Sequence, residues 1–427
     1  MRITDKTKKL IVKEKENAGR RFFKFVFAVP FWLILGALVL IAFGIGRAVY
    51  LIDTRPDQYV AEIWQNGSDS SFRHMSVFAN GIRAQGDKSP MTYIEGGKSI
   101  HLADIALMRK DLQGSSDTGS AASTKNIGYV EGKLRGWEDC YSSTVMATVN
   151  AIDVREGLEV TTGTADAQLV AVGGNYKAFH PFRYLSGGFL PEVPVDSNQI
   201  VINDVLAWKF YHSYDVVGNR LIINDQMFTI IGVVEEKNTR VAELAGEQQN
   251  RAFIYFGTLG VLYDSVGSES EDGDGAGGYK EPADYAIQCY EAILPELVRG
   301  VGVSDFKNAL PSYSFTNPQL YVSDNTGRFG VFRILDRIFP LGETDRERMG
   351  YEFPYWEKAA QITEERLFYD YVLVFLGIIL LLIGSVMIIL RIRAGKASGS
   401  DDADDRGGNE RTVRSANISF LEPGTDQ

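Results

Sequence analysis

The stretch NDVLAWKFYHSYDVVGNRLIINDQMFTIIGVV, residues 203–234, carries the densest local signals in the chain. Asn203 or Asp204 is suited to cap the short apolar helix that follows, because its side chain accepts a hydrogen bond from the first helical turn. Two runs rich in β-branched residues then flank Asn224 and Asp225, which tolerate the left-handed backbone of a hairpin turn. We therefore predict a compact helix and hairpin with a structural role.

Two long uncharged apolar runs lie far from this unit, at residues 25–46 and 371–390. A helix of about 20 apolar residues crosses the hydrocarbon core of a bilayer, so both runs are long enough to span it. The first run is also much longer than the apolar part of a cleaved signal peptide. We therefore expect two transmembrane helices, the first of them an uncleaved anchor.

Basic residues indicate how these helices are oriented. Residues 1–24 hold nine Lys or Arg against three acids, and RIRAGK follows the second run directly. Because basic flanks stay in the cytoplasm, we expect a two-pass protein of the cell membrane with both termini cytoplasmic and residues 47–370 outside. This exterior part has 29 basic and 45 acidic residues, which argues against nucleic acid as a partner.

The exterior part has the signals of a mixed α+β domain. A helical apolar spacing covers residues 99–112, whereas the segments 144–154 and 158–173 are rich in β-branched residues. More than 300 residues exceed the usual single core, so we expect two subdomains. Polar, low-complexity composition predicts mobile loops at 113–126 and 265–278, and a polar, disordered cytoplasmic tail at 391–427.

No motif for catalysis or cofactor binding is present. The chain has no phosphate-binding loop, no zinc-ligand spacing and no hydrolase elbow. We interpret each of the four histidines as a surface residue or a satisfied core residue: His74, His101, His180 and His212. We therefore predict no catalytic residue, no cofactor, no metal and no enzyme activity in this chain.

The two cysteines, Cys140 and Cys289, both lie in the exterior part. That compartment permits a disulfide between them. Two cysteines in so long a region are equally consistent with free buried thiols. Both alternatives stay open on the sequence.

Two neighbouring segments of the chain together resemble a known protein family. YKAFHPFRYLSGGFL at 176–190, followed by residues 198–236, is similar to the extracytoplasmic core domain of MacB-like and FtsX-like ABC transporter permeases. Gly188 departs from the family pattern, which often has Arg there. The matching positions are core and turn residues of that domain: Leu185, Gly187, Phe189, Val201, Ile202, Val217, Gly218, Ile222, Ile223, Phe228, Ile231, Gly232 and Val233.

The resemblance carries implications for function and partners. Permeases of this family have four membrane helices, whereas this sequence shows two apolar runs. The resemblance therefore implies a non-catalytic subunit that works with a separate ABC-type ATPase and a multi-span FtsX-like permease. Its exterior domain would transmit ATP-driven motion for export, or for the activation of an extracytoplasmic hydrolase.

Two other classes of protein share this organisation. A two-span scaffold such as a polysaccharide co-polymerase has both termini inside, but long coiled-coil helices are expected there and no heptad run occurs in residues 47–370. A ligand-sensing membrane protein would need a cytoplasmic signalling module, and the segment after residue 390 is short and polar. The transporter subunit is therefore our leading hypothesis.

Overall fold

The computed structural model describes residues 29–65, 71–94, 99–113, 137–155, 158–263, 284–296, 299–310, 320–338 and 351–418. The chain divides into two compact units. We call Leu51–Phe368 the sheet unit, and Met1–Tyr50 together with Tyr369–Gln427 the helix unit. The basic segment 1–24 and the loops predicted at 113–126 and 265–278, apart from Gln113, lie outside the described residues.

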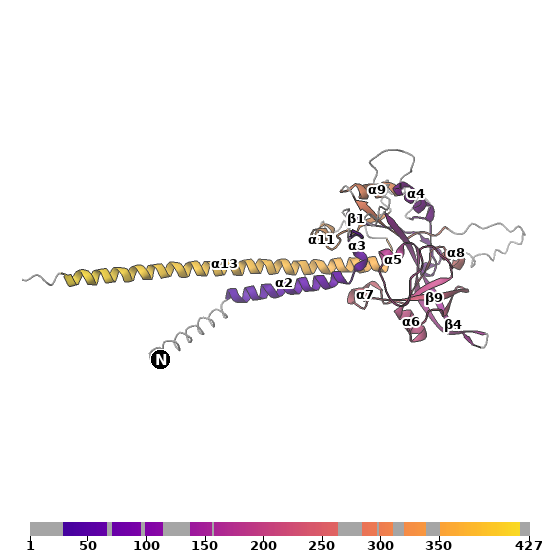
Figure 1. The fold of residues 1–427 in the computed structure, drawn as a ribbon, viewed down its shortest axis with the longest axis horizontal. Helices are drawn as coiled ribbons and strands as arrows, with labels where there is room; N and C mark the ends of the chain where they lie inside the picture. Colours follow the sequence, from indigo (N-terminus) through magenta and orange to yellow (C-terminus); the bar gives the residue numbers. More distant parts are fainter. Residues whose placement is uncertain are drawn as a thin grey trace, which may run out of the picture. The chain divides into compact units, whose positions relative to one another are not determined.

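The helix unit contains the apolar parts of α2 (Val29–Asp53) and α13 (Tyr355–Ile418). Within the described part of the chain, these are the helices long and apolar enough to cross a membrane, with mean hydropathies of 2.4 and 3.2. Figure 1 shows α2 alongside α13. Gly377 permits this close approach, because a Cβ there would lie 2.7 Å from Cγ1 of Ile41. An ion pair of 3.2 Å between Arg47 and Asp370 also joins the two helices.

The helices are longer than hydropathy predicts. The first reaches Asp53 instead of residue 46, and the second begins at Tyr355 instead of residue 371. It also continues to Ile418, so the tail predicted to be disordered is helical over much of its length. Hydropathy detects only the apolar part of a helix, whereas a helix that is already nucleated extends through polar residues one hydrogen bond at a time.

A ten-stranded mixed sheet forms the sheet unit. The long strands β4 (Glu138–Arg155) and β5 (Leu158–Gly174) pair as an antiparallel hairpin from Cys140 and Gly174 to Arg155 and Leu158, with a bulge at Ala151 and Ile152. The order along the sheet is β12 (Tyr321–Asp324), β1 (Ser71–Phe78), β11 (Cys289–Glu296), β4 (Glu138–Arg155), β5 (Leu158–Gly174), β10 (Arg251–Tyr255), β7 (Gln199–Asn203), β9 (Gln226–Glu235) and β6 (Arg183–Gly187). β8 (Arg220–Ile223) pairs with both β4 and β9.

These pairings close a ring of six strands. β4 binds β5, then the ring runs through β10, β7, β9 and β8, and β8 returns to β4. The other strands extend the sheet from β4 and β9. The length of the exterior part predicts two subdomains, but the described residues of Leu51–Phe368 form one compact unit, because β4 belongs both to the ring and to its β11–β1–β12 extension.

Successive side chains along the central strands pack in two different hydrophobic clusters. On β7, Ile200 and Ile202 pack in one cluster and Val201 packs in the other. On β10, Ile254 joins the first cluster and Phe253 the second. Successive residues of a strand point to opposite faces, so the sheet is covered on both sides. The second cluster also holds Tyr176, Phe179, Trp356 and both cysteines.

The predicted helix and hairpin at 203–234 are confirmed. Asn203 caps α6 (Asp204–Tyr211), and its Oδ1 accepts a hydrogen bond of 3.0 Å from the amide of Leu206. β8 and β9 then form the hairpin, with Asn224 and Asp225 at φ values of 45° and 62°. Positive φ at both turn residues is the requirement of a type I′ turn.

The remaining described elements are short and cover the sheet. They include the predicted helix at residues 99–112, found as α4 (Leu102–Gln113), which packs beside α9 (Val301–Ala309) (Figure 1). The others are α3 (Val60–Gln65), α5 (Tyr176–Phe179), α7 (Arg240–Ala245), α8 (Thr258–Tyr263), α11 (Val331–Ile338), the 3-10 helices Pro56–Gln58 and Gly86–Lys88, and a small sheet of β2 (Ile82–Arg83) and β3 (Met91–Thr92).

Candidate functional site: buried anchors of the helix ends

Arg328 fixes the start of α13 within the sheet unit. Its Nη1 and Nη2 donate hydrogen bonds of 2.6 and 2.7 Å to the two carboxylate oxygens of Glu357, and its Nε donates to Glu364. All three side chains are buried. Burial acts to lower the pKa of Arg328, but the two glutamates outweigh it and raise that pKa. Two buried carboxylates, two turns apart on one helix, thus share one guanidinium.

The same arginine also binds the segment that follows α2. Nη1 of Arg328 donates a hydrogen bond of 3.0 Å to Oε1 of Gln58, in the 3-10 helix after α2. On α11, Arg337 binds Glu364 and donates 3.0 Å to the Ser323 hydroxyl. One buried network therefore joins the residues after α2, the edge strand β12, α11 and the first turns of α13.

A second buried network holds the end of α2. Arg55 is fully buried and forms an ion pair with Glu247, in the loop that precedes β10. Asp57 lies 3.1 Å from Nζ of Lys237. Burial acts to raise the pKa of Asp57, but Lys237 and Arg55 outweigh it and hold that pKa at about 2. Opposite charges thus keep the chain in place where it leaves α2.

Arg251 of β10 connects this second network to α13. Its guanidinium pairs with Glu236 and donates to the backbone oxygens of Gly246 and Glu247. Its Cζ also lies 3.5 Å from the centroid of the Tyr355 ring, a cation–π contact with the first residue of α13. The central strand β10 therefore contacts the base of the second apolar helix directly.

A cavity of about 660 Å³ lies against these anchors. Asp57, Lys237, Glu247 and Tyr355 line it, together with His180. Charged side chains of both signs therefore face the cavity.

Behind His180, a buried carboxylate gathers several polar side chains. Oε2 of Glu291 lies 2.7 Å from Nε2 of His180 and 3.8 Å from Sγ of Cys140. Its other oxygen, Oε1, lies 3.2 Å from Nε2 of His74 and accepts a bond of 3.2 Å from the Ser76 hydroxyl. Burial acts to raise the pKa of Glu291, but the two histidines outweigh it and lower that pKa well below its usual range. We call His74, Cys140, His180 and Glu291 the Glu291 cluster.

Sequence reasoning missed the Glu291 cluster. His74 and His180 are buried, as the core alternative allowed, but nothing in their spacing links them to each other or to Cys140. Glu291 itself is a charged residue inside the apolar strand β11, where all residues are buried, and this is the one signal that could have indicated the cluster. Both Cys140 and Cys289 are free and buried, so the structure has the thiol alternative and not the disulfide.

The family-signature residues lie elsewhere, in β6 and the residues just after it, in β7, in the approach to β8, and in the hairpin β8–β9. Gly187 and Gly232 face each other there, and a Cβ on Gly232 would lie 2.0 Å from the backbone oxygen of Gly188. Val217 is 47% exposed and belongs to the turn before β8. The fully buried members are Val201, Ile202, Ile223, Phe228 and Val233, and the partly buried ones that pack on the clusters are Leu185, Phe189 and Ile231. These residues build the scaffold, whereas the anchors lie at the ends of its strands and helices.

The fold and its anchors define a mixed α/β domain carried by two apolar helices. Residues 98–277 match the model of the MacB-like periplasmic core domain, so this part of the sheet unit is MacB-like. Among curated proteins, none matches this sequence.

Two solved structures are similar to the chain. The periplasmic region of MacB from Actinobacillus actinomycetemcomitans is 12% identical, with a TM-score of 0.34, and the match covers 63% of this chain and 94% of that one. The extracellular domain of the noncanonic ABC-type transporter YknZ from Gram-positive bacteria is 13% identical, with a TM-score of 0.34, and the match covers 58% of this chain and 99% of that one.

Proposed function

We propose that this chain is a non-catalytic subunit of an ABC transporter assembly of the MacB/FtsX type, and that its exterior domain transmits motion of the membrane helices. The proposal rests on the family of the sheet unit and on one observation about its anchors. The residues that follow α2 and those that begin α13 are both held to the sheet by buried ion pairs.

Buried anchors of this kind favour the transmission of helix movement to the sheet unit, because they resist local rearrangement at the start of α13. α13 runs without a break from Glu357 and Glu364 through its apolar part. Removing one partner of a buried ion pair costs about 3–5 kcal/mol, so the base of the helix resists local rearrangement. In this proposal, α13 is therefore the element through which a displacement in the membrane would reach the sheet unit.

The proposal places the catalytic step in a partner. ATP hydrolysis belongs to an ABC-type ATPase in the cytoplasm, and a multi-span FtsX-like permease supplies the remaining membrane helices. Both termini of this chain are cytoplasmic, and the sheet unit is extracytoplasmic. The energy of the ATPase then reaches the exterior through α2 and α13.

Affinity purification of the full chain from the membranes of its own host, in mild detergent, tests this assignment. We expect an ABC-type ATPase and a multi-span permease to be recovered in fixed ratio, with ATPase activity in the purified fraction. Recovery of the chain alone, or with polysaccharide synthesis enzymes in place of an ATPase, would overturn the proposal.

A further inference from the structure

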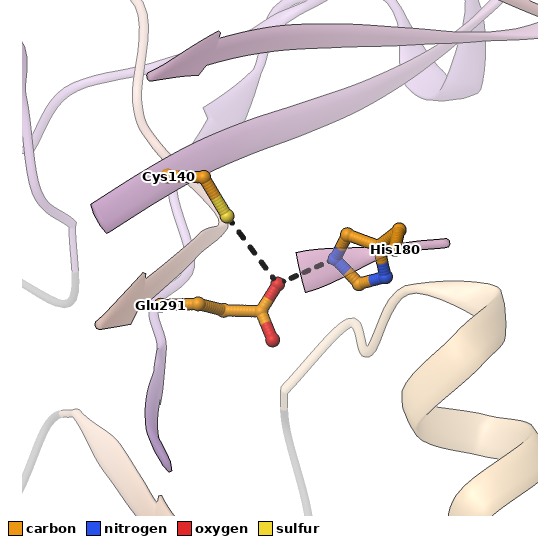
Figure 2. Close-up of side chains that lie close together, drawn as sticks. All are labelled: Cys140, His180 and Glu291. Atoms are coloured by element: carbon orange, nitrogen blue, oxygen red, sulfur yellow. Dashed lines mark hydrogen bonds and ion pairs between the residues drawn. The ribbon is translucent and has the colours of Figure 1, made fainter. Parts of the chain in front are cut away.

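The Glu291 cluster places metal-binding atoms together inside the sheet unit. Cys140 lies on β4 and Glu291 on β11, and the two residues are direct partners in the antiparallel register. His180 follows α5, and its ring points towards the same carboxylate (Figure 2). Sγ of Cys140, a ring nitrogen of His180 and an oxygen of Glu291 all lie within 4.8 Å of one another, and all three residues are buried.

Hydrogen bonds within the protein satisfy both oxygens of Glu291 but leave one polar atom of the cluster without a partner. A buried thiol contributes only a weak donor, and it lies 3.8 Å from Oε2 of Glu291. Nδ1 of His74 is buried and has no hydrogen-bond partner among the described residues. Burial of polar and charged groups is costly unless they are fully paired or bind a metal ion. Apolar side chains at these positions would cost less free energy to bury than a thiol, two imidazoles and a carboxylate. The retention of these four groups therefore favours a role as metal ligands and their partners.

The separations between the atoms suit one small cation. Ligands lie about 2.0–2.3 Å from a zinc ion, so any two of them lie within about 4.6 Å of each other. The distance from Glu291 Oε2 is 2.7 Å to Nε2 of His180 and 3.8 Å to Sγ of Cys140. Figure 2 shows both interactions converging on this one oxygen. Small shifts of the three side chains would therefore admit an ion between them.

We propose that Cys140, His180 and Glu291 bind a divalent ion of the zinc class. A thiolate and an imidazole favour zinc over magnesium or calcium, which prefer oxygen ligands alone. On binding, the Cys140 thiol gives up its proton to water and forms the sulfur–metal bond. Three protein ligands leave the fourth tetrahedral position for a water molecule. This site is independent of the proposed transport function.

The surroundings of the Glu291 cluster supply the other parts of a metal site. His180 lines the cavity of about 660 Å³, which gives the ion a route from solvent. His74 and Ser76 hold Oε1 of Glu291 and leave Oε2 towards the other ligands. Asn325 in turn donates 2.7 Å to the Ser76 hydroxyl. Partners of this kind orient a ligating carboxylate, and their loss lowers metal affinity by about 10–100-fold.

Metal analysis of the full chain in detergent tests the site, with an affinity tag that contains no histidine and without chelators. We expect about one zinc per chain by elemental mass spectrometry. Exchange with cobalt(II) should give a thiolate-to-cobalt charge-transfer absorption in the near ultraviolet. A wild-type chain that binds neither ion stoichiometrically after both are supplied would overturn the proposal.

Two cysteine variants separate ligation from folding. Cys140→Ser should abolish the charge-transfer absorption, whereas Cys289→Ser should keep it, because Cys289 is an equally buried thiol outside the cluster. His74→Gln should retain the absorption and weaken cobalt affinity by about 10–100-fold. Zinc should raise the unfolding temperature of the wild type and of Cys289→Ser. Absorption that persists in Cys140→Ser would contradict the assignment even if that variant folds normally.

Discussion

The Arg328 guanidinium meets the Glu357 carboxylate in a two-pronged contact, with Nη1 2.6 Å from Oε2 and Nη2 2.7 Å from Oε1. Both side chains are buried, and Glu357 lies in the first turn of α13. This geometry favours arginine over lysine, because only the planar guanidinium presents two parallel donors. The start of the second apolar helix is therefore fixed in both position and orientation within the sheet unit.

Loss of this arginine should destabilise the sheet unit strongly. Arg328→Met leaves Glu357 buried without its cation, and we expect the free energy of unfolding to fall by about 3–5 kcal/mol. Arg333→Met is the matched control, because Arg333 pairs with Asp324 at 2.7 Å but is 41% exposed, and such pairs contribute at most about 1 kcal/mol. Denaturant unfolding of the full chain in detergent measures both changes. Equal effects of the two variants would show that Arg328 is no anchor.

Acid should weaken the anchor at Asp57. The folded-state pKa of Asp57 is about 2, against 3.8 for the ordinary carboxyl group, so its contribution is present above about pH 4 and is lost as the pH falls towards 2. Asp57→Asn should therefore make the free energy of unfolding less dependent on pH between 4 and 2. A pH series of denaturant unfolding curves for both proteins measures this difference. Parallel curves over that range would exclude the stabilising pair with Lys237.

Asn203 should contribute more than a helix cap. Its Oδ1 accepts from the amides of Leu206 and Arg251, and its Nδ2 donates 2.7 Å to the backbone oxygen of Gln249. We expect Asn203→Ala to lower the free energy of unfolding by about 1–3 kcal/mol, since the cap is lost and buried backbone groups stay unpaired. Asn238→Ala is the control, because Asn238 is exposed. A shift no larger than that of the control would limit Asn203 to a minor role.

Close packing of α2 against α13 should depend on Gly377. A leucine there would collide with Ile41, whereas Gly36 of α2 has open space around its missing side chain. We expect Gly377→Leu to reduce disulfide crosslinking of an Arg47→Cys and Asp370→Cys pair, and Gly36→Leu to leave it unchanged. Crosslinking yield in membranes, read on non-reducing gels, measures the effect. Unchanged yield in Gly377→Leu would mean that the helices do not pack through this glycine.

Local features of the fold could be predicted from the sequence. The cap at Asn203 and the turn at Asn224 and Asp225 depend on neighbouring residues, and their backbone conformations follow from residue type. Membrane spans are equally local, because hydropathy sums over one continuous segment. The start of α13 could not be predicted in this way, because its first turns are held by contacts with residues that are distant in the sequence.

The anchors and the Glu291 cluster could not be predicted. Arg55 and Glu247 are far apart in the sequence, and a charged residue that becomes buried looks the same there as an exposed one. The cluster likewise draws residues from β1, β4, β11 and the segment after α5, which only the pairing of the strands brings together. Glu291 carries the one signal that could have indicated the cluster, because an acid inside a largely apolar strand indicates a buried partner.

Energy transfer between the sheet unit and a lipid dye tests the central claim most directly. The donor is attached at Val195→Cys, which is 89% exposed, while both native cysteines are buried. In nanodiscs that contain the chain with its ATPase and permease, we predict an ATP-dependent change in transfer. The change should persist in Arg333→Lys and be lost in Arg328→Lys, which keeps the charge but not the two-pronged contact. A signal that does not respond to ATP in the wild type, or that responds equally in Arg328→Lys, would contradict transmission of motion through the anchor.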